Sequence, residues 1–412
     1  MFDVVGVCVK AREASYSLAT MDNNQKNAML ECIANAITQS KDAIKSANDI
    51  DIARLTGTSQ IAFMDRLMLD DERIDKMAEG VRQIMSLPDP IGEVTDSWTM
   101  YNGIKMNKVR CPLGVIGVIY EARPNVTIDV AALCLKSGNA VVLRGGKEAI
   151  NSNRALYNII KRALEENGFD ANVVGFVDEI DREATRELLE QERYVDVIIP
   201  RGGNGLKKFV LEHAHMPVIA SAGGNCHTYI EGTADINMAS EILFNAKMQR
   251  PTVCNATEHL LIDRSIVSHL GEIVAPLVKA GCTLLGDDEV VDAIGCARAS
   301  QEDYFTEYLD YTISIHVVAD YNEAINWIND HGTKHSEAIV SDNRTAIDMF
   351  TRKVDAGAVY VNASTRFTDG FEYGFGAEIG ISTQKLHARG PLGLKQLTSE
   401  KYIAFGNGQI RK

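Results

Sequence analysis

Hydrophobic residues near the start of the chain recur at helical spacing. Residues 12–86 are predicted to be helical throughout. The last of these helices carries one apolar stripe, made by Ile74, Met77, Ala78, Val81, Ile84 and Met85. Such a stripe predicts core packing. Pro88 and Pro90 should end this helix, and residues 98–111 then predict two extended segments that turn at Asn102–Gly103, a strong hairpin dipeptide.

Short apolar runs begin after Pro112 and alternate with helical patterns. Helices are expected after EARPN and near residues 152, 182 and 206. The predicted strands are residues 113–120, 140–144, 172–177, 195–200 and 217–221. Buried strands that alternate with helices predict a parallel sheet covered on both faces. The pattern favours a doubly wound α/β architecture of the kind that binds nucleotides.

A second α/β series is expected from about residue 230. Its helices should start at Asp235 and cover residues 321–329 and 343–353. Its strands are predicted near residues 258–262, 282–286, 312–318, 337–341 and 358–361, with a late strand at 401–405. A chain of 412 residues exceeds what one core usually supports. Two domains are therefore predicted, with a boundary near residue 230.

Composition and charge exclude several classes of protein. The hydrophobic share of 45% is typical of a globular chain, and the net charge of −14 argues against nucleic acid or an anionic membrane as partner. No apolar run approaches the ~20 residues of a membrane helix, and the first residues do not resemble a signal peptide. The eight cysteines are scattered without a CxxC pair, which predicts free thiols and a cytoplasmic protein.

Three glycine pairs follow predicted strands: Gly145–Gly146, Gly202–Gly203 and Gly223–Gly224. In open α/β sheets, ligands bind at the carboxyl ends of strands, where glycine lets the backbone approach a phosphate. The alternative is that each turn simply needs glycine. Arg144 and Lys147 beside the first pair suit the extra phosphate of NADP, or are solvated charges of a turn. No GxxxxGK[ST] loop is present, so a kinase-type phosphate cradle is not expected.

The stretch KMQRPTVCNATEHLLI places Cys254 between a helical pattern that ends at Arg250–Pro251 and a strand that begins near His259. A cysteine in such a loop can reach a substrate. The alternative is simple packing, because free cysteine is among the most buried residue types. Arginines in predicted loops could bind a carboxylate or phosphate through both donors of the guanidinium, or be solvated: Arg123, Arg250 and Arg366.

His331 and His335, in HGTKH, have the spacing of two metal ligands on one helical face. Gly332 breaks the helix between them, and no nearby carboxylate or cysteine supplies a third ligand. No metal site is therefore predicted.

Several long segments resemble one enzyme family. They are IYEARPNVTIDVAALCLKSGNAVVLRGGKEA, PRGGNGL, QRPTVCNATEHLLI, INDHGTKHSEAIVS and VNASTRFTDGFEYGFGAEIGISTQKLHARGPLGL. They are similar to the gamma-glutamyl phosphate reductases, also called glutamate-5-semialdehyde dehydrogenases, of the aldehyde dehydrogenase superfamily. The resemblance runs from about residue 5 to the end of the sequence. It implies NADPH-dependent reduction of L-glutamate 5-phosphate to the semialdehyde and phosphate, the second step of proline biosynthesis from glutamate.

The resemblance also implies an aldehyde dehydrogenase-like fold, with two doubly wound α/β domains and a small β flap for oligomerisation. The NADPH-binding domain would comprise residues 1–97 and 112–230, including the N-terminal helices. The catalytic domain would comprise residues 231–385, and the flap residues 98–111 and 395–412. A homo-oligomer, either a dimer or a tetramer, is expected.

Residue roles follow from the same resemblance. Cys254 is the expected nucleophile and Glu307 the expected cofactor-ribose ligand. The expected NADPH site consists of Arg144, Gly145, Gly146, Lys147, Gly202 and Gly203. The side chain that holds the oxyanion is either Asn125, our first choice, or Arg123. Arg123 and Arg366 are expected to bind the substrate's α-carboxylate and phosphate.

One position departs from the wider superfamily. Hydrolytic aldehyde dehydrogenases carry a glutamate that activates water, and Ser221 of SAGG takes its place here. A thioester on Cys254 would therefore not be hydrolysed, which suits a phosphate-dependent enzyme. The rivals are a hydrolytic aldehyde dehydrogenase and an inactive relative that keeps the fold. A kinase fused to this chain is not expected, although a separate glutamate 5-kinase is a possible partner.

Overall fold

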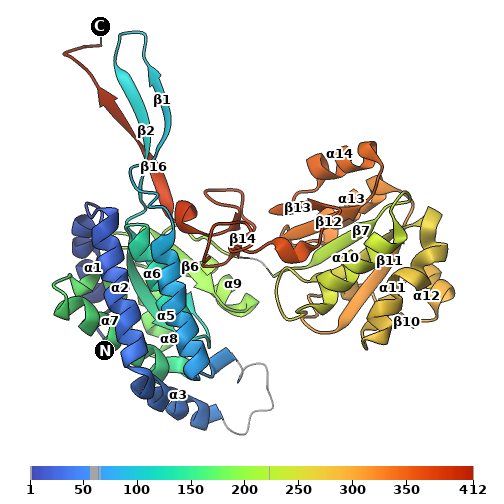
Figure 1. The fold of residues 1–412 in the computed structure, drawn as a ribbon, viewed down its shortest axis with the longest axis horizontal. Helices are drawn as coiled ribbons and strands as arrows, with labels where there is room; N and C mark the ends of the chain where they lie inside the picture. The colour runs from blue at the N-terminus through green and yellow to red at the C-terminus, as the bar shows by residue number, and fades with distance from the viewer. Residues whose placement is uncertain (1, 56–63, 65, 222, 412) are drawn as a thin grey trace. The chain divides into compact units, whose positions relative to one another are not determined.

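The computed structural model describes residues 2–55, 64, 66–221 and 223–411 (Figure 1). The chain forms two compact units. The first unit consists of Met1–Ala220, Gly374–Gly380 and Leu392–Lys412, and the second of Ser221–Tyr373 and Ile381–Pro391.

The units differ from the predicted domains in two places. The first boundary lies between Ala220 and Ser221 instead of near residue 230, because the strand that follows belongs to the second unit. The segment Gly374–Gly380, which was predicted to be part of the catalytic domain, belongs to the first unit. Nearly all of the predicted strand–helix alternation is present on each side of this boundary.

A parallel sheet forms the centre of the first unit, with strand order β5-β4-β3-β6. Its strands are β3 (Val115–Tyr120), β4 (Ala140–Gly145), β5 (Val174–Phe176) and β6 (Val197–Arg201). Every residue of β3 is buried. Sheets covered on both faces have such continuous apolar strands, which explains why the apolar runs predicted these strands correctly.

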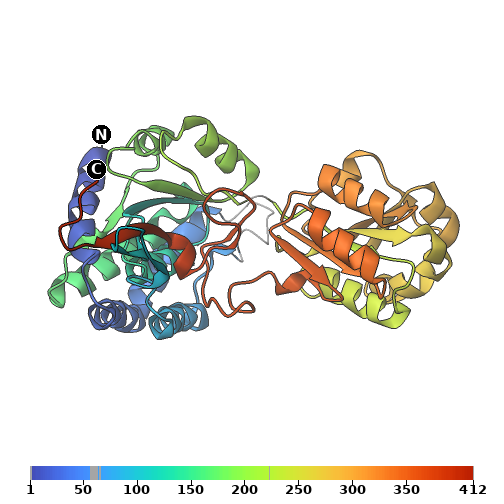
Figure 2. The same ribbon diagram turned by 90° about the horizontal axis from the view of Figure 1, so that it is seen from above.

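Helices cover both faces of this sheet, as Figure 2 shows. They are α1 (Val4–Leu18), α2 (Asn23–Gln39), α3 (Lys41–Leu55), α5 (Asp71–Ser86), α6 (Asn125–Lys136), α7 (Ile150–Glu166), α8 (Arg182–Leu189) and α9 (Asn204–His213). Helix α1 shares a core with α8 and α9, whereas α2 and α5 pack against α6. The apolar stripe of α5 is buried from Ile74 to Ile84, as predicted. Residues 56–63 and 65 of the predicted helical region lie outside the described residues.

The predicted hairpin is confirmed and acquires a third strand. Strands β1 (Val94–Thr99), β2 (Lys105–Pro112) and β16 (Thr398–Phe405) form an antiparallel sheet in the order β1-β2-β16. Gly103 adopts a φ of +85° in the β1–β2 turn, a conformation that favours glycine. Strand β16 pairs with β2 along its whole length, from Thr398 opposite Pro112 to Phe405 opposite Lys105.

A larger parallel sheet forms the centre of the second unit, with strand order β10-β9-β11-β8-β7-β12-β13. Its strands are β7 (Cys226–Ile230), β8 (Thr257–Asp263), β9 (Thr283–Gly286), β10 (Ala297–Arg298), β11 (Thr312–Val318), β12 (Ser336–Val340) and β13 (Ala358–Val361). A short antiparallel ribbon is added by β14 (Ile381–Ser382) and β15 (Gly390–Pro391).

Two groups of helices cover this sheet. One core joins its strands to α10 (Ile236–Met248), α11 (Leu270–Lys279) and α12 (Asp288–Ile294). A second core joins them to α13 (Tyr321–His331) and α14 (Arg344–Lys353). None of the helices in the described ranges is long and apolar enough to cross a membrane.

Two strand predictions near the boundary were wrong. Residues 217–221 do not form a strand and contribute only an isolated bridge between Val218 and Ile198. Residues 226–230, which were not predicted as a strand, form β7 in the interior of the second sheet. Its polar residues obscured the pattern, since His227 and Thr228 are buried and hydrogen-bonded to Glu337 and Thr257.

Candidate active site

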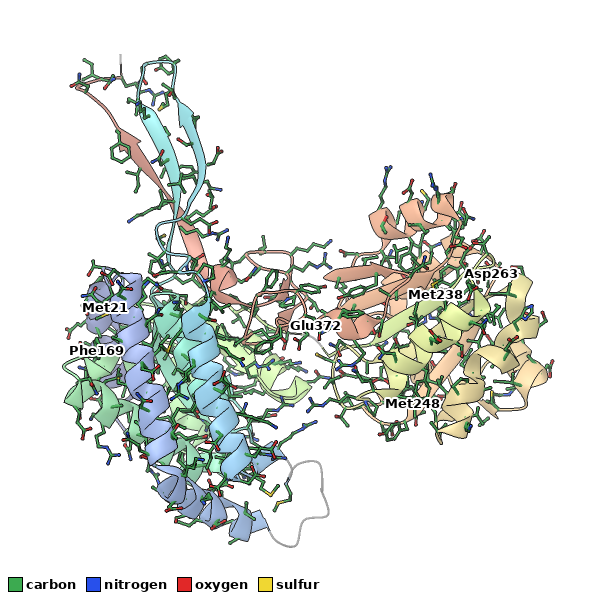
Figure 3. All side chains as sticks on the ribbon, viewed as in Figure 1. Met21, Phe169, Met238, Met248, Asp263 and Glu372 are labelled. Atoms are coloured by element: carbon green, nitrogen blue, oxygen red, sulfur yellow. The ribbon has the colours of Figure 1, made fainter. Side chains whose placement is uncertain are left out.

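Cys254 lies in the loop between α10 and β8, as predicted. Helix α10 ends at Met248 (Figure 3), and β8 begins at Thr257. The Cys254 residue is partly exposed, whereas Asn255 and Ala256 after it are buried. The loop therefore holds a partly exposed cysteine residue next to two buried residues.

The backbone of Gly224 packs against the backbone of this loop. A Cβ atom at Gly224 would lie 1.4 Å from the carbonyl oxygen of Cys254, so only glycine permits this approach. The same carbonyl accepts a hydrogen bond from Sγ of Cys226, at 3.2 Å. The Gly223–Gly224 pair therefore supports the cysteine loop. The pair lies just before β7, so the prediction that it follows a strand was wrong.

Glu307 reaches the same point of the structure. Its Oε1 accepts the backbone N–H of Gly224 at 2.6 Å. The predicted cofactor-ribose ligand and the predicted nucleophile thus contact the same glycine within the second unit. The sequence held no local signal for this contact, because 83 residues separate Gly224 from Glu307.

Arg366 bridges the two ends of the cysteine loop. Its Nε donates to Oε1 of Gln249 at 3.0 Å, and its Nη1 donates to Oδ1 of Asn255. Burial and the nearby charge of Arg250 lower the pKa of Arg366, whereas the charges of Asp369 and Cys254 raise it. The fixed guanidinium is thus electrostatically coupled to the thiol, and a cation there favours the thiolate.

Asn255 anchors the loop to the segment that carries Arg366. Its Nδ2 donates to the carbonyl oxygen of Thr368 at 2.9 Å, and its own carbonyl accepts from Oγ1 of Thr365 at 2.7 Å. These bonds are buried, so they hold the residue after the nucleophile in one orientation.

A buried ion pair joins the two elements that flank the loop, and the sequence did not reveal it. Lys247 in the last turn of α10 donates to Glu258 near the start of β8 at 2.5 Å, and both side chains are fully buried. Glu258 also accepts the backbone N–H of Leu309 at 3.2 Å. Burial raises the pKa of Glu258 to about 7, although Lys247 opposes this shift. The two residues lie in the stretch around Cys254, but no local pattern shows that they pair.

A cavity of about 820 Å³ in the first unit lies beside the ends of β3 and β4. Three of the predicted cofactor residues line it: Arg144, Gly146 and Lys147. Gly145 lies at the end of β4, tightly against Asn153. Gly203, which follows Gly202, donates its backbone N–H to Oε2 of Glu121 at 2.8 Å, and Glu121 lines the cavity. The volume falls within the ~300–1,000 Å³ of sites that enclose small molecules.

The cationic side chains around this cavity differ in whether they already have hydrogen-bond partners within the protein. Arg144 donates to the carbonyl oxygens of Gly145, Ile180 and Asp181 at 3.1, 3.1 and 3.3 Å, so it holds the loop beside the cavity. Lys147 and Arg182 are exposed on its lining, and neither forms an ion pair or hydrogen bond with a described residue. The sequence did not point to Arg182, which starts α8 beyond the expected glycine loops.

The remaining predicted residues lie in α6, in the loop before it and at the start of the second unit. Asn125 begins α6 in the first unit and donates to Oδ2 of Asp129 at 2.9 Å. Burial raises the pKa of Asp129 to about 6, which Asn125 partly offsets. Arg123 is exposed in the preceding loop, and Ser221 is the partly exposed first residue of the second unit. The choice between Asn125 and Arg123 for the oxyanion stays a prediction.

Three comparisons identify similar proteins. Residues 3–313 match the model of the aldehyde dehydrogenase family. The gamma-glutamyl phosphate reductases of Ligilactobacillus salivarius and Clostridium beijerinckii are 50% and 51% identical, covering 98% and 97% of this chain and 97% and 98% of theirs. The crystal structure of gamma-glutamyl phosphate reductase from Thermotoga maritima matches over 100% of both chains, with a TM-score of 0.97 and 42% identity.

Proposed function

Because the chain belongs to the aldehyde dehydrogenase family, and within it to the gamma-glutamyl phosphate reductases, we propose that it reduces L-glutamate 5-phosphate through a thioester on Cys254, with NADPH as reductant. The products are L-glutamate 5-semialdehyde and phosphate, and the reaction is the second step of proline biosynthesis from glutamate. The observation that carries this proposal is the partly exposed Cys254 on a loop fixed by Gly224 and Arg366.

The thiolate of Cys254 attacks the acyl carbonyl of the substrate, and the bond to phosphate breaks. The electrostatic coupling of Arg366 to the thiol supports this first step. Backbone N–H groups of the loop and Asn125, or Arg123 in its place, hold the oxyanion of each tetrahedral stage. The thiohemiacetal formed by reduction then collapses, which releases the aldehyde and regenerates the thiol.

The cavity of the first unit suits NADPH, which supplies a hydride to the thioester carbonyl when it is bound. Lys147 and Arg182 are the cations on the cavity lining that lack partners among the described residues, and they would bind the cofactor's phosphate groups. Arg144 would hold the loop that carries Gly145 and Gly146, and Gly202 and Gly203 would let the backbone approach the cofactor. Glu307 would bind the ribose while it orients Gly224.

The other partners are also part of the proposal. Arg366 and Arg123 would bind the substrate's carboxylate and phosphate, because a guanidinium can bond both oxygens of such a group. The sheet of β1, β2 and β16 would form the flap of a homo-oligomer, either a dimer or a tetramer. We place the enzyme in the cytoplasm, where a separate glutamate 5-kinase would supply its labile acyl phosphate.

The reverse reaction tests this function against hydrolytic aldehyde dehydrogenase activity. The assay follows NADP reduction, and in parallel NAD reduction, with glutamate semialdehyde and a phosphate titration. Strict dependence on phosphate is expected, because Ser221 cannot act as the base that activates water. Turnover without phosphate would support the hydrolytic alternative, and no turnover at all would support an inactive relative.

Substitution of the nucleophile tests the thioester. Cys254→Ser should abolish reduction but leave NADPH binding nearly intact, since the proposed cofactor cavity lies in the other unit. Cys296→Ser is the matched control, because this partly exposed thiol of the same unit has no assigned role. Substantial turnover by Cys254→Ser would refute the assignment, and unchanged kinetic constants in Arg123→Ala would remove Arg123 from the site.

A further inference from the structure

Asn225 lies between the two residues that contact the backbone of Cys254. Gly224 packs against that backbone, and Sγ of Cys226 donates to the carbonyl oxygen of Cys254 at 3.2 Å. The Asn225 residue is only 1% exposed. The place of Asn225 in the core therefore sets where both of its neighbours meet the cysteine loop.

The pairing of β7 with β8 is irregular at the start of β7. Cys226 pairs with Thr257, but the next residue, His227, pairs with His259. Strand β8 thus carries one extra residue, Glu258, between the two pairs. Such a bulge interrupts the ladder and redirects nearby side chains. Backbone pairing alone therefore does not fix the segment next to Cys226, and a side-chain contact across the strands is needed.

A hydrogen bond between two side chains crosses the strands at this bulge. Nε2 of His259 contacts Oδ1 of Asn225. Nδ2 of Asn225 donates to the carbonyl oxygens of His331 and Tyr304 at 2.8 and 3.4 Å, so Oδ1 is the acceptor and Nε2 of the histidine the donor. Nδ1 of His259 lies 2.6 Å from Oγ of Ser314, its direct neighbour on β11.

His259 is neutral in this arrangement. Burial holds the pKa of His259 well below its usual value, and the charges of His227 and Lys247 act in the same direction. A neutral ring has one donor and one acceptor, so Nδ1 accepts the hydroxyl hydrogen of Ser314. Both ring nitrogens are thus used, and all three side chains of the chain Ser314–His259–Asn225 are buried. A fully satisfied buried network holds one arrangement.

We infer that His259 is a positioning residue for the reaction, an inference that rests on Cys254 as the nucleophile. Its ring, held by Ser314, fixes Asn225 and thereby the two neighbours that contact the Cys254 carbonyl. Arg366 holds the same loop through Gln249 and Asn255, so the two anchors act on different residues of it. A bond that served only the fold would stabilise the sheet without affecting the rate of the reaction.

Replacement of the ring tests the inference in the reverse reaction, with glutamate semialdehyde, phosphate and NADP. His259→Leu should lower kcat by roughly 10- to 100-fold, because a small misplacement of the nucleophile is costly. Each KM should stay within about twofold, since no group proposed to bind substrate or cofactor is changed. His259→Gln, whose amide can still donate to Asn225, should recover most of the rate. An unchanged kcat in His259→Leu, or no recovery in His259→Gln, would overturn the inference.

Tyr229→Phe is the matched control, because it removes another buried hydrogen bond between the same two strands. The hydroxyl of Tyr229 on β7 donates to Oδ2 of Asp263 at 3.0 Å, at the end of β8 that is away from the cysteine loop. This variant should melt at a lower temperature but keep its kcat in assays well below that temperature. A fall in kcat as large as that of His259→Leu would show that any weakening of the sheet slows the reaction, and would overturn the inference.

Ser314→Ala tests the same chain while it keeps the ring, and replaces His259→Leu if that variant does not fold. It leaves Nδ1 of His259 without its donor, so the ring is held less firmly. We expect a fall in kcat of roughly three- to tenfold, the worth of one hydrogen bond, with little change in KM. An unchanged kcat would show that the ring needs no support from Ser314, against the inference.

Alkylation of Cys254 by iodoacetamide separates this inference from the proposed function. Its rate, followed by the mass of the peptide that contains Cys254, requires neither substrate nor cofactor. His259→Leu should slow the alkylation, whereas Tyr229→Phe should not. A wild-type protein without turnover would refute the proposed function, yet alkylation slowed only in His259→Leu would still support the positioning. Equal alkylation rates in the wild type and both variants would overturn it.

Discussion

Gly224→Ala is the sharpest test of how the cysteine loop is held. The added Cβ would lie 1.4 Å from the carbonyl oxygen of Cys254 and 2.3 Å from its carbonyl carbon, where ordinary contacts begin at 3.4 Å. Both atoms belong to the backbone, so no side chain can swing away. The two segments must separate by about 2 Å, and a misplacement of ~1 Å can cost ~100-fold in rate.

We therefore expect kcat of Gly224→Ala to fall by at least ~100-fold, with slower alkylation of Cys254 by iodoacetamide. Overpacking should lower the free energy of unfolding by about 1–3 kcal/mol. Binding of NADPH, measured by fluorescence, should weaken only modestly, because the proposed cofactor cavity lies in the other unit and only the ribose contact of Glu307 depends on Gly224.

Gly271→Ala is the matched control in the same unit. Gly271 lies in α11, and the nearest atom to its added Cβ is Cγ2 of Ile294 at 3.8 Å, an ordinary contact. This variant should keep full activity and gain about 0.5–1 kcal/mol of stability, as alanine favours a helix. If Gly224→Ala turned over within about threefold of the wild type with an unchanged melting curve, the close approach would not hold the nucleophile.

Three further predictions address other parts of the chain. Lys247→Met should lower the free energy of unfolding in urea by about 3–5 kcal/mol, because it leaves Glu258 buried without its partner. Adding Glu258→Leu to this variant should restore most of the lost stability. Unchanged stability of Lys247→Met would contradict the buried pair. Asp355→Asn should lower stability by roughly 1 kcal/mol at pH 7, since Lys385, Lys334 and Arg389 hold the pKa of Asp355 below its usual value. That stability is present above the unfolded pKa of about 4 and is lost as the pH falls, so the gap should narrow between pH ~5 and ~2, and a gap that is constant with pH would refute the cause. Tyr402→Glu on the flap should shift the oligomer to a smaller mass in light scattering, whereas Tyr16→Glu, equally exposed on α1, should not; an unchanged mass for both would argue against assembly through the flap.

Much of the fold followed from local patterns. Strand β3 is one buried apolar run, and β8 contains the apolar run 260–262. The stripe of α5 recurs at three- and four-residue spacing, so these local patterns were sufficient to predict all three elements. Strand β7 escaped because His227 and Thr228 are polar. Their burial depends on Glu337 and Thr257, which are distant in sequence, and no local pattern can supply such partners.

The residues of the site also fall into two groups, those with a local signal in the sequence and those without one. Cys254 and the glycine pairs of the first unit were predicted from loop position and resemblance, and their roles stay predictions. The ion pair of Lys247 and Glu258 was not, and neither was Arg182, because their surroundings depend on how separate elements pack. Arg144 lines the cavity, but its guanidinium donates to backbone carbonyls, a detail that only the loop conformation determines.

The path of the chain also bears on how the protein is made. The whole large sheet of the second unit comes from one continuous stretch, from β7 to β13. The first unit instead needs β16, whose residue Ser399 pairs with Cys111 of β2. During translation, the later unit can thus complete its sheet while the earlier one still lacks a strand. Until β16 is made, the middle strand β2 is an edge with unpaired backbone groups, and such edges favour pairing with other chains.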